Sequence, residues 1–338
     1  MPPPRRILPP RMFLLSFLLL SPAEPCSPQP DATRFVCTEP TLTTFPRGLP
    51  PTTLAVSVEF TALATLLPTA LAGLPQLQEL HLSSNRLAAL PEALLRPVPT
   101  LRVLDLTDNV LADLPASIFT STIHLQHLVL RGNRLRALQP AWFRHLPQLQ
   151  WLDLAANALT EVPPEVFAPL RSLRSLDLSH NQLAALAPGT LAGLRALEQL
   201  DLEGNGLKTL PSGIFTPLPA LRLLFLQDNE LRALPSGIFT PLRHLRVLDL
   251  ARNRLQTLEL PPRLAGHPGL DLDISGNPWV CECRLLSLLR RAAPQLAASR
   301  DTLCASPASL RGQEVATAST SETTGCEPQG DEKHQLEP

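Results

Sequence analysis

Three residues at intervals of 24 place a nucleophile, a base and a carboxylate in one column of the sequence. Ser57, His81 and Asp105 have the residue types of a Ser-His-Asp triad, in which histidine accepts the serine proton and aspartate orients the histidine. If each interval is one structural repeat, adjacent side chains start about 4.8 Å apart, which is too wide for hydrogen bonds without side-chain reach. No glycine-rich turn supplies an oxyanion hole. We therefore predict that the protein is not an enzyme.

A second set at the same interval presents carboxylates. Asp153, Asp177 and Asp201 offer the oxygen ligands that Ca²⁺ prefers, but no nearby loop supplies the carbonyl oxygens that complete such sites. The chain also lacks a metal-protease helix, a phosphate-binding loop and a dinucleotide fingerprint. We expect no cofactor, and an unchanged melting temperature in the presence of a chelator.

The element that must position these columns is a 24-residue repeat marked by asparagine. The frame Leu-x-x-Leu-x-Leu-x-x-Asn recurs, as in residues 77–85, and Val56, Val58 and Thr61 form a degenerate first copy, giving about ten rungs. Asparagine occurs nowhere else in the chain, and its nine positions are Asn85, Asn109, Asn133, Asn157, Asn181, Asn205, Asn229, Asn253 and Asn277.

Within each rung, apolar and polar residues alternate as in a short strand with one buried face. Leu104 and Leu106 should point into the stack and Asp105 outward, and ten parallel strands would make a ribbon about 40–50 Å long. The asparagine amide should bond buried backbone groups of its own and the adjacent turn. A second apolar spine is expected from a column of phenylalanines, Phe119, Phe143, Phe167, Phe215 and Phe239.

This pattern resembles the leucine-rich repeat family, whose repeat length it shares. The resemblance implies an α/β solenoid, that is, a leucine-rich repeat horseshoe with a parallel concave β-sheet and disulfide-closed N- and C-terminal caps. It also implies that the protein binds another protein on its concave face.

The chain divides into five predicted segments. The first segment has the pattern of a signal peptide, with arginines at its start, an apolar run at 12–20 and a small-x-small cleavage site. We therefore expect a secreted, extracellular protein without a membrane anchor. Losing that segment changes the formal net charge from −1 to −4, which argues against nucleic acid as a partner. The segments are 1–23 signal peptide, 24–52 N-terminal cap, 53–277 repeats, 278–326 cysteine-rich C-terminal cap and 327–338 disordered tail.

The six cysteines lie in the two caps. Cys26 and Cys37 are expected to close the N-terminal cap. The other four allow three pairings, and the strain of a bond across one residue leaves two. Resemblance to extracellular members of the family favours Cys281 with Cys304 and Cys283 with Cys326.

The outward strand positions carry many acids and few bases. Twelve acidic side chains stand there against only Arg131 and Arg252, with further arginines at the edge, such as Arg102, Arg174, Arg222 and Arg246. This separation of acidic from basic side chains would attract a basic partner toward the concave face. The alternative is that aspartate at this position of the repeat is simply a solvated residue without a binding role. Exposed aromatic residues would add binding energy. The predicted partner-binding residues are Trp151, Asp153, Asp177, Asp201, Phe225 and Asp249.

A closer resemblance, carried by residues 81–119 and 273–281, is to a secreted plasma glycoprotein of this family. It implies modulation of transforming growth factor-β signalling and angiogenesis, and binding of basic proteins such as cytochrome c, by a monomer. No asparagine lies in a glycosylation signal, so sugar would be O-linked within 317–324. The alternatives are a non-catalytic subunit that stabilises a secreted enzyme and an extracellular matrix component.

Overall fold

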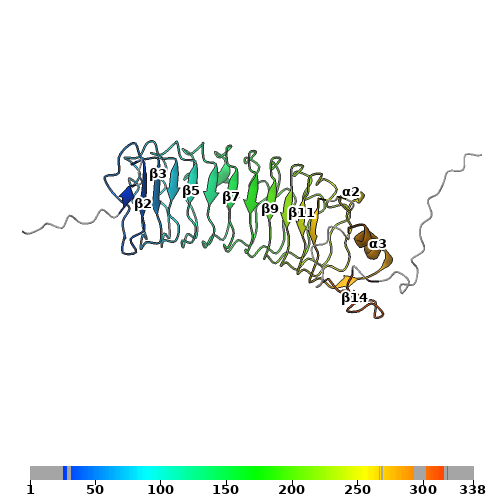
Figure 1. Cartoon of the computed structure of the whole chain (residues 1–338). Coiled ribbons are helices and arrows are strands. Elements are labelled where there is room, and N and C mark those ends of the chain that lie inside the picture. Colours follow the sequence, from blue (N-terminus) through cyan, green and yellow to red (C-terminus); the bar gives the residue numbers. More distant parts are fainter. Residues whose placement is uncertain are drawn as a thin grey trace, which may run out of the picture.

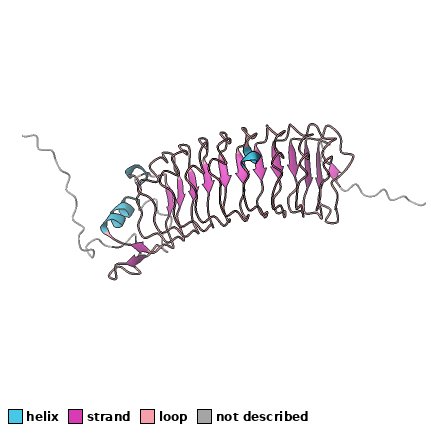
Figure 2. Ribbon diagram, turned by 180° about the vertical axis from the view of Figure 1, so that it is seen from behind, coloured by secondary structure: helices cyan, strands magenta, loops and turns pink. Residues whose placement is uncertain are grey.

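The computed structural model describes residues 26–28, 32–265, 267, 269–292, 302–315 and 318. The predicted signal peptide and C-terminal tail lie outside the described residues. The described chain winds into an elongated, gently curved solenoid whose strands stand side by side along one face (Figures 1 and 2). The fold predicted from the repeat is confirmed.

The strands are short and the helices few. The strands are β1 (Ser27–Pro28), β2 (Arg34–Cys37), β3 (Ala55–Val58), β4 (Glu79–His81), β5 (Val103–Asp105), β6 (His127–Val129), β7 (Trp151–Asp153), β8 (Ser175–Asp177), β9 (Gln199–Asp201), β10 (Leu223–Phe225), β11 (Val247–Asp249), β12 (Asp271–Asp273), β13 (Trp279–Val280) and β14 (Cys304–Ser306). The helices are α1 (Pro140–Phe143), α2 (Pro262–Ala265) and α3 (Cys283–Ala292).

One sheet of twelve strands follows the order of the chain from β1 to β12. Strands β2 to β12 are parallel, and only β1 runs antiparallel, against β2. The cap strand β2 thus adds a strand to the ten predicted from the repeat. In β5, Leu104 is buried while Val103 and Asp105 are half-exposed, because successive side chains of a strand point to opposite faces.

The asparagine ladder bonds each turn of the solenoid to the one before it. Asn157 Nδ2 donates to Leu154 O and Ala155 O of its own turn, at 3.1 Å each, and to Leu130 O of the preceding turn at 2.9 Å. Its Oδ1 accepts the Leu135 N–H at 3.0 Å. The ladder thus satisfies buried backbone groups that no regular structure pairs.

The residue before each ladder asparagine adopts a left-handed backbone conformation. At these nine positions φ lies between 50° and 68°, although only three are glycine. One of them is Gly204, where an added Cβ would lie 2.4 Å from His180 Nδ1 of the preceding turn. The sharp turn after each strand is therefore a property of the ladder and not of glycine alone.

The convex side of the array is packed by aromatic residues. All five predicted phenylalanines are buried. Phe143 and Phe167 have ring centroids 5.6 Å apart, and Phe215 and Phe239 stack at 6.2 Å. Trp142 in α1 is fully buried, and its Nε1–H donates to a carbonyl oxygen of the preceding turn at 3.1 Å.

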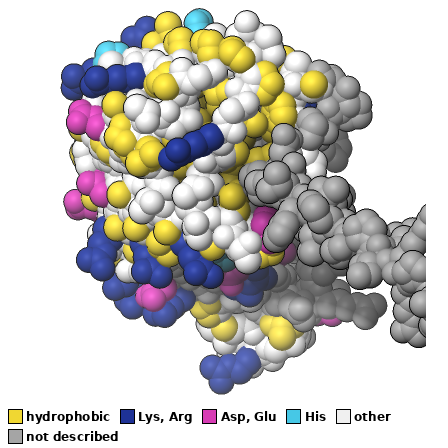
Figure 3. Space-filling view, turned by 90° about the vertical axis from the view of Figure 1, so that its left-hand side faces the viewer, with side chains coloured by type: hydrophobic (Ala, Val, Ile, Leu, Met, Phe, Trp, Pro, Cys, Tyr) yellow, Lys and Arg dark blue, Asp and Glu magenta, His cyan; other side chains and the backbone are white. Residues whose placement is uncertain are grey.

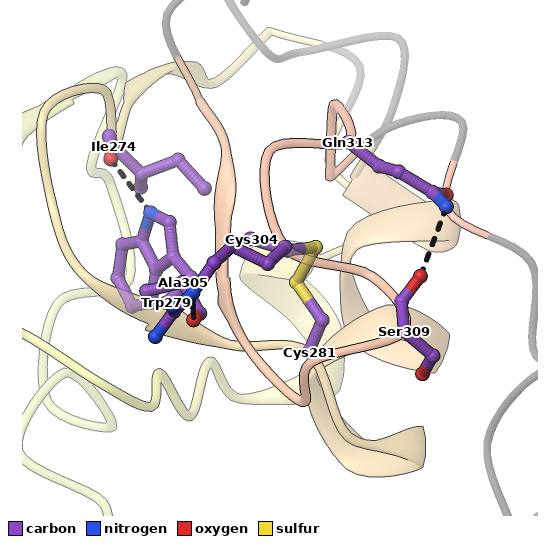
Figure 4. The surroundings of a disulfide bond; sticks show 8 residues. Ile274, Trp279, Cys281, Cys304, Ala305, Ser309 and Gln313 are labelled. Atoms are coloured by element: carbon purple, nitrogen blue, oxygen red, sulfur yellow. Dashed lines mark hydrogen bonds between the residues drawn. A yellow bond between two sulfur atoms is a disulfide. The ribbon is translucent and has the colours of Figure 1, made fainter.

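Both ends of the stack are covered by disulfide-closed caps. Cys26 pairs with Cys37 at the N-terminal end. At the other end Cys281 pairs with Cys304, the pairing that the resemblance implied, beside the buried Trp279 (Figure 4). Cys283 is also disulfide-bonded, and its predicted partner Cys326 lies outside the described residues.

Candidate functional site

The parallel register arranges the outward side chains of the concave face in two columns. The last residues of the strands form one column, in which Asp153 pairs with Asp177 and Asp177 with Asp201 on successive strands. Phe225 interrupts this column between Asp201 and Asp249. We name as the acidic column Asp105, Asp153, Asp177, Asp201, Asp249 and Asp273.

Each carboxylate of the acidic column is held by the backbone turn that follows its strand. Asp177 Oδ1 accepts the Ser179 N–H at 2.8 Å, and Asp201 Oδ1 accepts the Glu203 N–H at 2.9 Å. The other four make the same bond to the residue two positions on. Side-chain oxygens of aspartate commonly stabilise turns in this way. One carboxylate oxygen of each aspartate therefore stabilises a turn. The other oxygen lies 3.8 Å from His81 Nδ1 in Asp105 and 3.9 Å from an Arg131 nitrogen in Asp177.

The acidic side chains are less exposed than a freely solvated face would be. Asp153 is only 9% exposed, while Asp177, Asp201 and Asp249 are half-buried. Burial raises the pKa of Asp201 to about 6, and Asp177 on the adjacent strand adds to the rise. Burial likewise raises the pKa of Asp153 and Asp249. These shifts mean that ionising these three carboxyl groups is costly without a compensating positive charge.

A groove runs along the other outward column and holds the exposed aromatic residue of this face. Its volume is about 480 Å³, and its lining includes Trp151, Leu223 and arginines of the strand edge such as Arg174. The Trp151 side chain is 40% exposed. Phe225 does not line this groove. The structure therefore separates the two aromatic residues that the sequence grouped in one binding surface.

Sequence reasoning noticed the edge arginines but treated them only as charges that compensate the acids. In the structure Arg174, Arg222 and Arg246 line the same groove as Trp151. Seen from the end nearest β2, Figure 3 shows Lys and Arg side chains low on the molecule and at the upper left, with acidic side chains at the left margin between them and some low among the basic ones. These arginines are separated by multiples of the 24-residue repeat, and that common register was the signal for the groove.

The Ser57, His81 and Asp105 column has the predicted register, but it is not a catalytic triad. His81 Nδ1 lies 3.8 Å from Asp105 Oδ2, and its Nε2 lies 3.9 Å from Glu79 Oε2. Pairing with Asp105 raises the pKa of His81 against the effect of burial. For Asp105, burial favours a higher pKa, but bonds to His81 and Thr107 outweigh it and hold the pKa low. Both ring nitrogens therefore face carboxylates, which favours an imidazolium over a base for serine.

The aspartates considered for Ca²⁺ do not converge on one point. Among the described residues, the group of three potential metal ligands whose atoms lie within 4.8 Å of one another is Glu59, His81 and Asp105. Asp153, Asp177 and Asp201 instead follow the sheet in a line. A line of carboxylates suits a ligand with several positive charges better than a single ion.

No helix among the described residues has the length and apolar character that crossing a membrane requires.

Two curated relatives match part of the chain. A phospholipase A2 inhibitor beta of Elaphe climacophora is 53% identical over 72 residues, and a phospholipase A2 inhibitor of Gloydius brevicaudus siniticus is 51% identical over the same length. Each match covers 20% of this chain and 22% of the relative, so the chain aligns with about a fifth of the relatives' length.

Solved structures share the fold over much more of the chain. A leucine-rich repeat protein of Leptospira interrogans has a TM-score of 0.64 and 28% identity, over 74% of this chain and 62% of that one. A chain in the octameric complex of Latrophilin 3, Unc5D and the leucine-rich repeats of FLRT2 has a TM-score of 0.67 and 26% identity, over 85% of this chain and 81% of that one.

The family model for the leucine-rich repeat matches residues 99–159, 152–207, 205–255 and 219–278, which together span more than half of the chain. With the ladder, the parallel sheet and these structural neighbours, the match shows that the chain belongs to the leucine-rich repeat family.

Proposed function

We propose that this protein is a secreted, non-enzymatic binding protein that captures a basic protein ligand on its concave face. The observation that carries the proposal is the acidic column, a line of carboxylates on an open sheet in which burial raises the pKa of Asp153, Asp201 and Asp249. A ligand that brings lysine or arginine side chains to this line would relieve the cost of ionising it.

The geometry gives the ligand two kinds of contact. The carboxylate oxygens of Asp201 and Asp249 that the turns do not use, and that of Asp177 beside Arg131, accept bonds from cationic side chains of the ligand. Phe225 supplies an apolar surface within the same column, and Trp151 offers its exposed indole in the other column. Aromatic residues surrounded by polar contacts are typical centres of binding energy.

Relatives support a protein target. The two snake proteins are named as inhibitors of phospholipase A2, which is itself a protein, and FLRT2 occurs in an assembly with other proteins. The stretches 81–119 and 273–281 resemble leucine-rich alpha-2-glycoprotein. On that resemblance we propose cytochrome c as a ligand, and components of the transforming growth factor-β pathway as partners through which the protein modulates angiogenesis.

Calorimetric titration with cytochrome c tests the proposal. The informative variant carries Asp177→Asn, Asp201→Asn and Asp249→Asn, because asparagine keeps the side-chain oxygen that accepts the turn N–H while removing the charge. We expect at least a tenfold loss of affinity in the triple variant, and a steep fall of wild-type affinity between 50 and 500 mM salt as screening increases, on the order of one decade or more.

The matched control removes three charges elsewhere, as Glu39→Gln, Glu161→Gln and Glu259→Gln, all of which are exposed and outside the sheet. Its affinity should stay within about twofold of wild type, since remote charges are screened. Equal binding by both triple variants, or binding that salt does not weaken, would refute the concave acidic site. Parallel titrations with transforming growth factor-β test the second partner class.

A further inference from the structure

A cluster of cationic side chains lies at the edge of the sheet near the C-terminal end of the array. Three adjoining hollows of about 370, 480 and 380 Å³ share Arg222 in their lining. Arg246 lines two of them, as does His244. The third hollow, which we name the basic hollow, is also lined by Arg243, His267, the buried Leu245 and Gly269.

The charge of this cluster is only partly compensated. Glu198 accepts from Arg174 at 2.8 Å and lies 3.7 Å from Arg222 Nε, so one carboxylate serves two guanidinium groups. Arg243 and Arg246 are exposed and form no salt bridge with any residue that the structure describes. Two guanidinium groups are therefore open to an anion from outside.

The pairing of strands β10 and β11 places two of these arginines on adjacent rungs. Arg222 and Arg246 immediately precede the paired strands β10 and β11, so their backbones lie about 4.8 Å apart along the solenoid. Arg174 occupies the same position two rungs earlier. Glu198 occupies this position on the rung between Arg174 and Arg222, so the forked donors on consecutive rungs are Arg222 and Arg246. Together with Arg243 they offer donors to a linear chain whose anionic groups recur along its length.

The surroundings of the cluster favour a sulfated glycan over other anionic ligands. Among the described residues, the exposed large hydrophobic side chains are Phe60, Leu67, Ile123, Trp151 and Leu303, and none lines the basic hollow. A membrane-binding surface would combine its basic residues with apolar ones, and a site for single-stranded nucleic acid would add stacked aromatics. Trp151 lines the neighbouring groove, but the guanidinium forks of the basic hollow have no exposed large apolar side chain beside them, which suits sulfate groups on a hydrophilic polymer.

We propose that the basic hollow binds a sulfated glycosaminoglycan. This site lies on the opposite edge of the strands from the acidic column, and it takes a ligand of opposite charge. One molecule could thus hold a basic protein and a sulfated glycan at the same time, each on its own edge of the sheet.

The test is titration of the full-length protein with a heparin octasaccharide, compared between wild type and a double variant with Arg243→Gln and Arg246→Gln. We expect the double variant to bind about tenfold more weakly, because two charge-assisted contacts are lost. The slope of log Kd against log salt concentration should fall by about 1–2, in line with the number of cations removed.

A charge-matched control carries Arg134→Gln and Arg136→Gln, which are exposed on a distant rung. Its affinity should stay within about twofold of wild type. Equal binding by the double variant and the control would overturn the proposal, as would equal affinity for unsulfated hyaluronan. Binding to phosphatidylserine vesicles without binding to the octasaccharide would overturn it in favour of a membrane. Circular dichroism of each variant excludes misfolding as the cause of a loss.

Discussion

Replacing a ladder asparagine in the middle of the array tests how the turns are held together. Asn157→Leu removes a fully polar side chain at a buried position and replaces it with one of similar size. It deletes the bonds from Nδ2 to Leu130 O, Leu154 O and Ala155 O, and the bond that Oδ1 accepts from Leu135 N–H.

The four lost bonds are not equally costly. Each of the three carbonyl oxygens keeps a second donor, from Asn133 Nδ2, Asn181 Nδ2 and the Gly132 N–H respectively. The Leu135 N–H has no other acceptor among the described residues. One stranded buried donor costs about 1–3 kcal/mol, and the weakened carbonyls add less because they remain satisfied. We therefore expect the variant to lose about 1–3 kcal/mol of unfolding free energy.

Urea unfolding followed by circular dichroism measures this loss as a lower midpoint. A companion variant, Asn157→Asp, keeps the acceptor for the Leu135 N–H but sets a carboxylate against three carbonyl oxygens, so its loss should be larger at pH 7 and shrink as pH falls. Arg136→Leu, at an exposed position, serves as the control and should change stability by less than about 0.5 kcal/mol. A wild-type midpoint for Asn157→Leu would refute the assigned role of the ladder.

The remaining predictions concern charge, backbone and core. Because burial raises the pKa of Asp201 to about 6, the folded state holds its proton more tightly than the unfolded state, and the free energy of unfolding falls as pH rises from about 4 to 6. Asp201→Asn should remove this part of the pH dependence, on the order of 1–3 kcal/mol of unfolding free energy. Urea unfolding measured from pH 4 to 7.5 checks this. Gly204→Ala should destabilise by about 1–2 kcal/mol or more, since φ is +64° and the added Cβ would meet His180, whereas Gly206→Ala, with only an ordinary contact, should unfold like wild type. Trp142→Phe should lower the thermal midpoint by several degrees, because it opens a gap and leaves a carbonyl without its indole donor; no change in scanning calorimetry would contradict this.

The repeat could be predicted because its periodicity is local. Leucines at fixed offsets require burial, and the residue between Leu104 and Leu106 must then face outward, so the direction of every strand residue follows from spacing alone. The asparagine at each turn is the residue type whose amide can both donate and accept, and its partners were correctly expected in its own and the adjacent turn.

The details of the candidate site could not be predicted in this way, because they depend on distances across rungs. Trp151 lies six residues before Asn157 and Phe225 four before Asn229, so spacing alone assigns them to different columns, but only the structure shows that Trp151 shares a groove with arginines. It also treated Asp153 as exposed, whereas packing buries it and a turn N–H occupies one of its oxygens. Burial, and with it the pKa of a carboxyl group, is set by neighbours 24 or more residues away.

By itself, then, the sequence determined the family, the parallel sheet and the faces of each strand, since these follow from a hydrophobic period that repeats without interruption. Tertiary structure decided how deeply each charge is buried and which arginines outside the repeat register join those within it. The stacking of rungs aligned six aspartates along one edge of the sheet and brought Arg222, Arg243 and Arg246 around one hollow at the other. Charges separated in sequence interact only when folding fixes their distance, and that distance controls both burial and the energy of each pair.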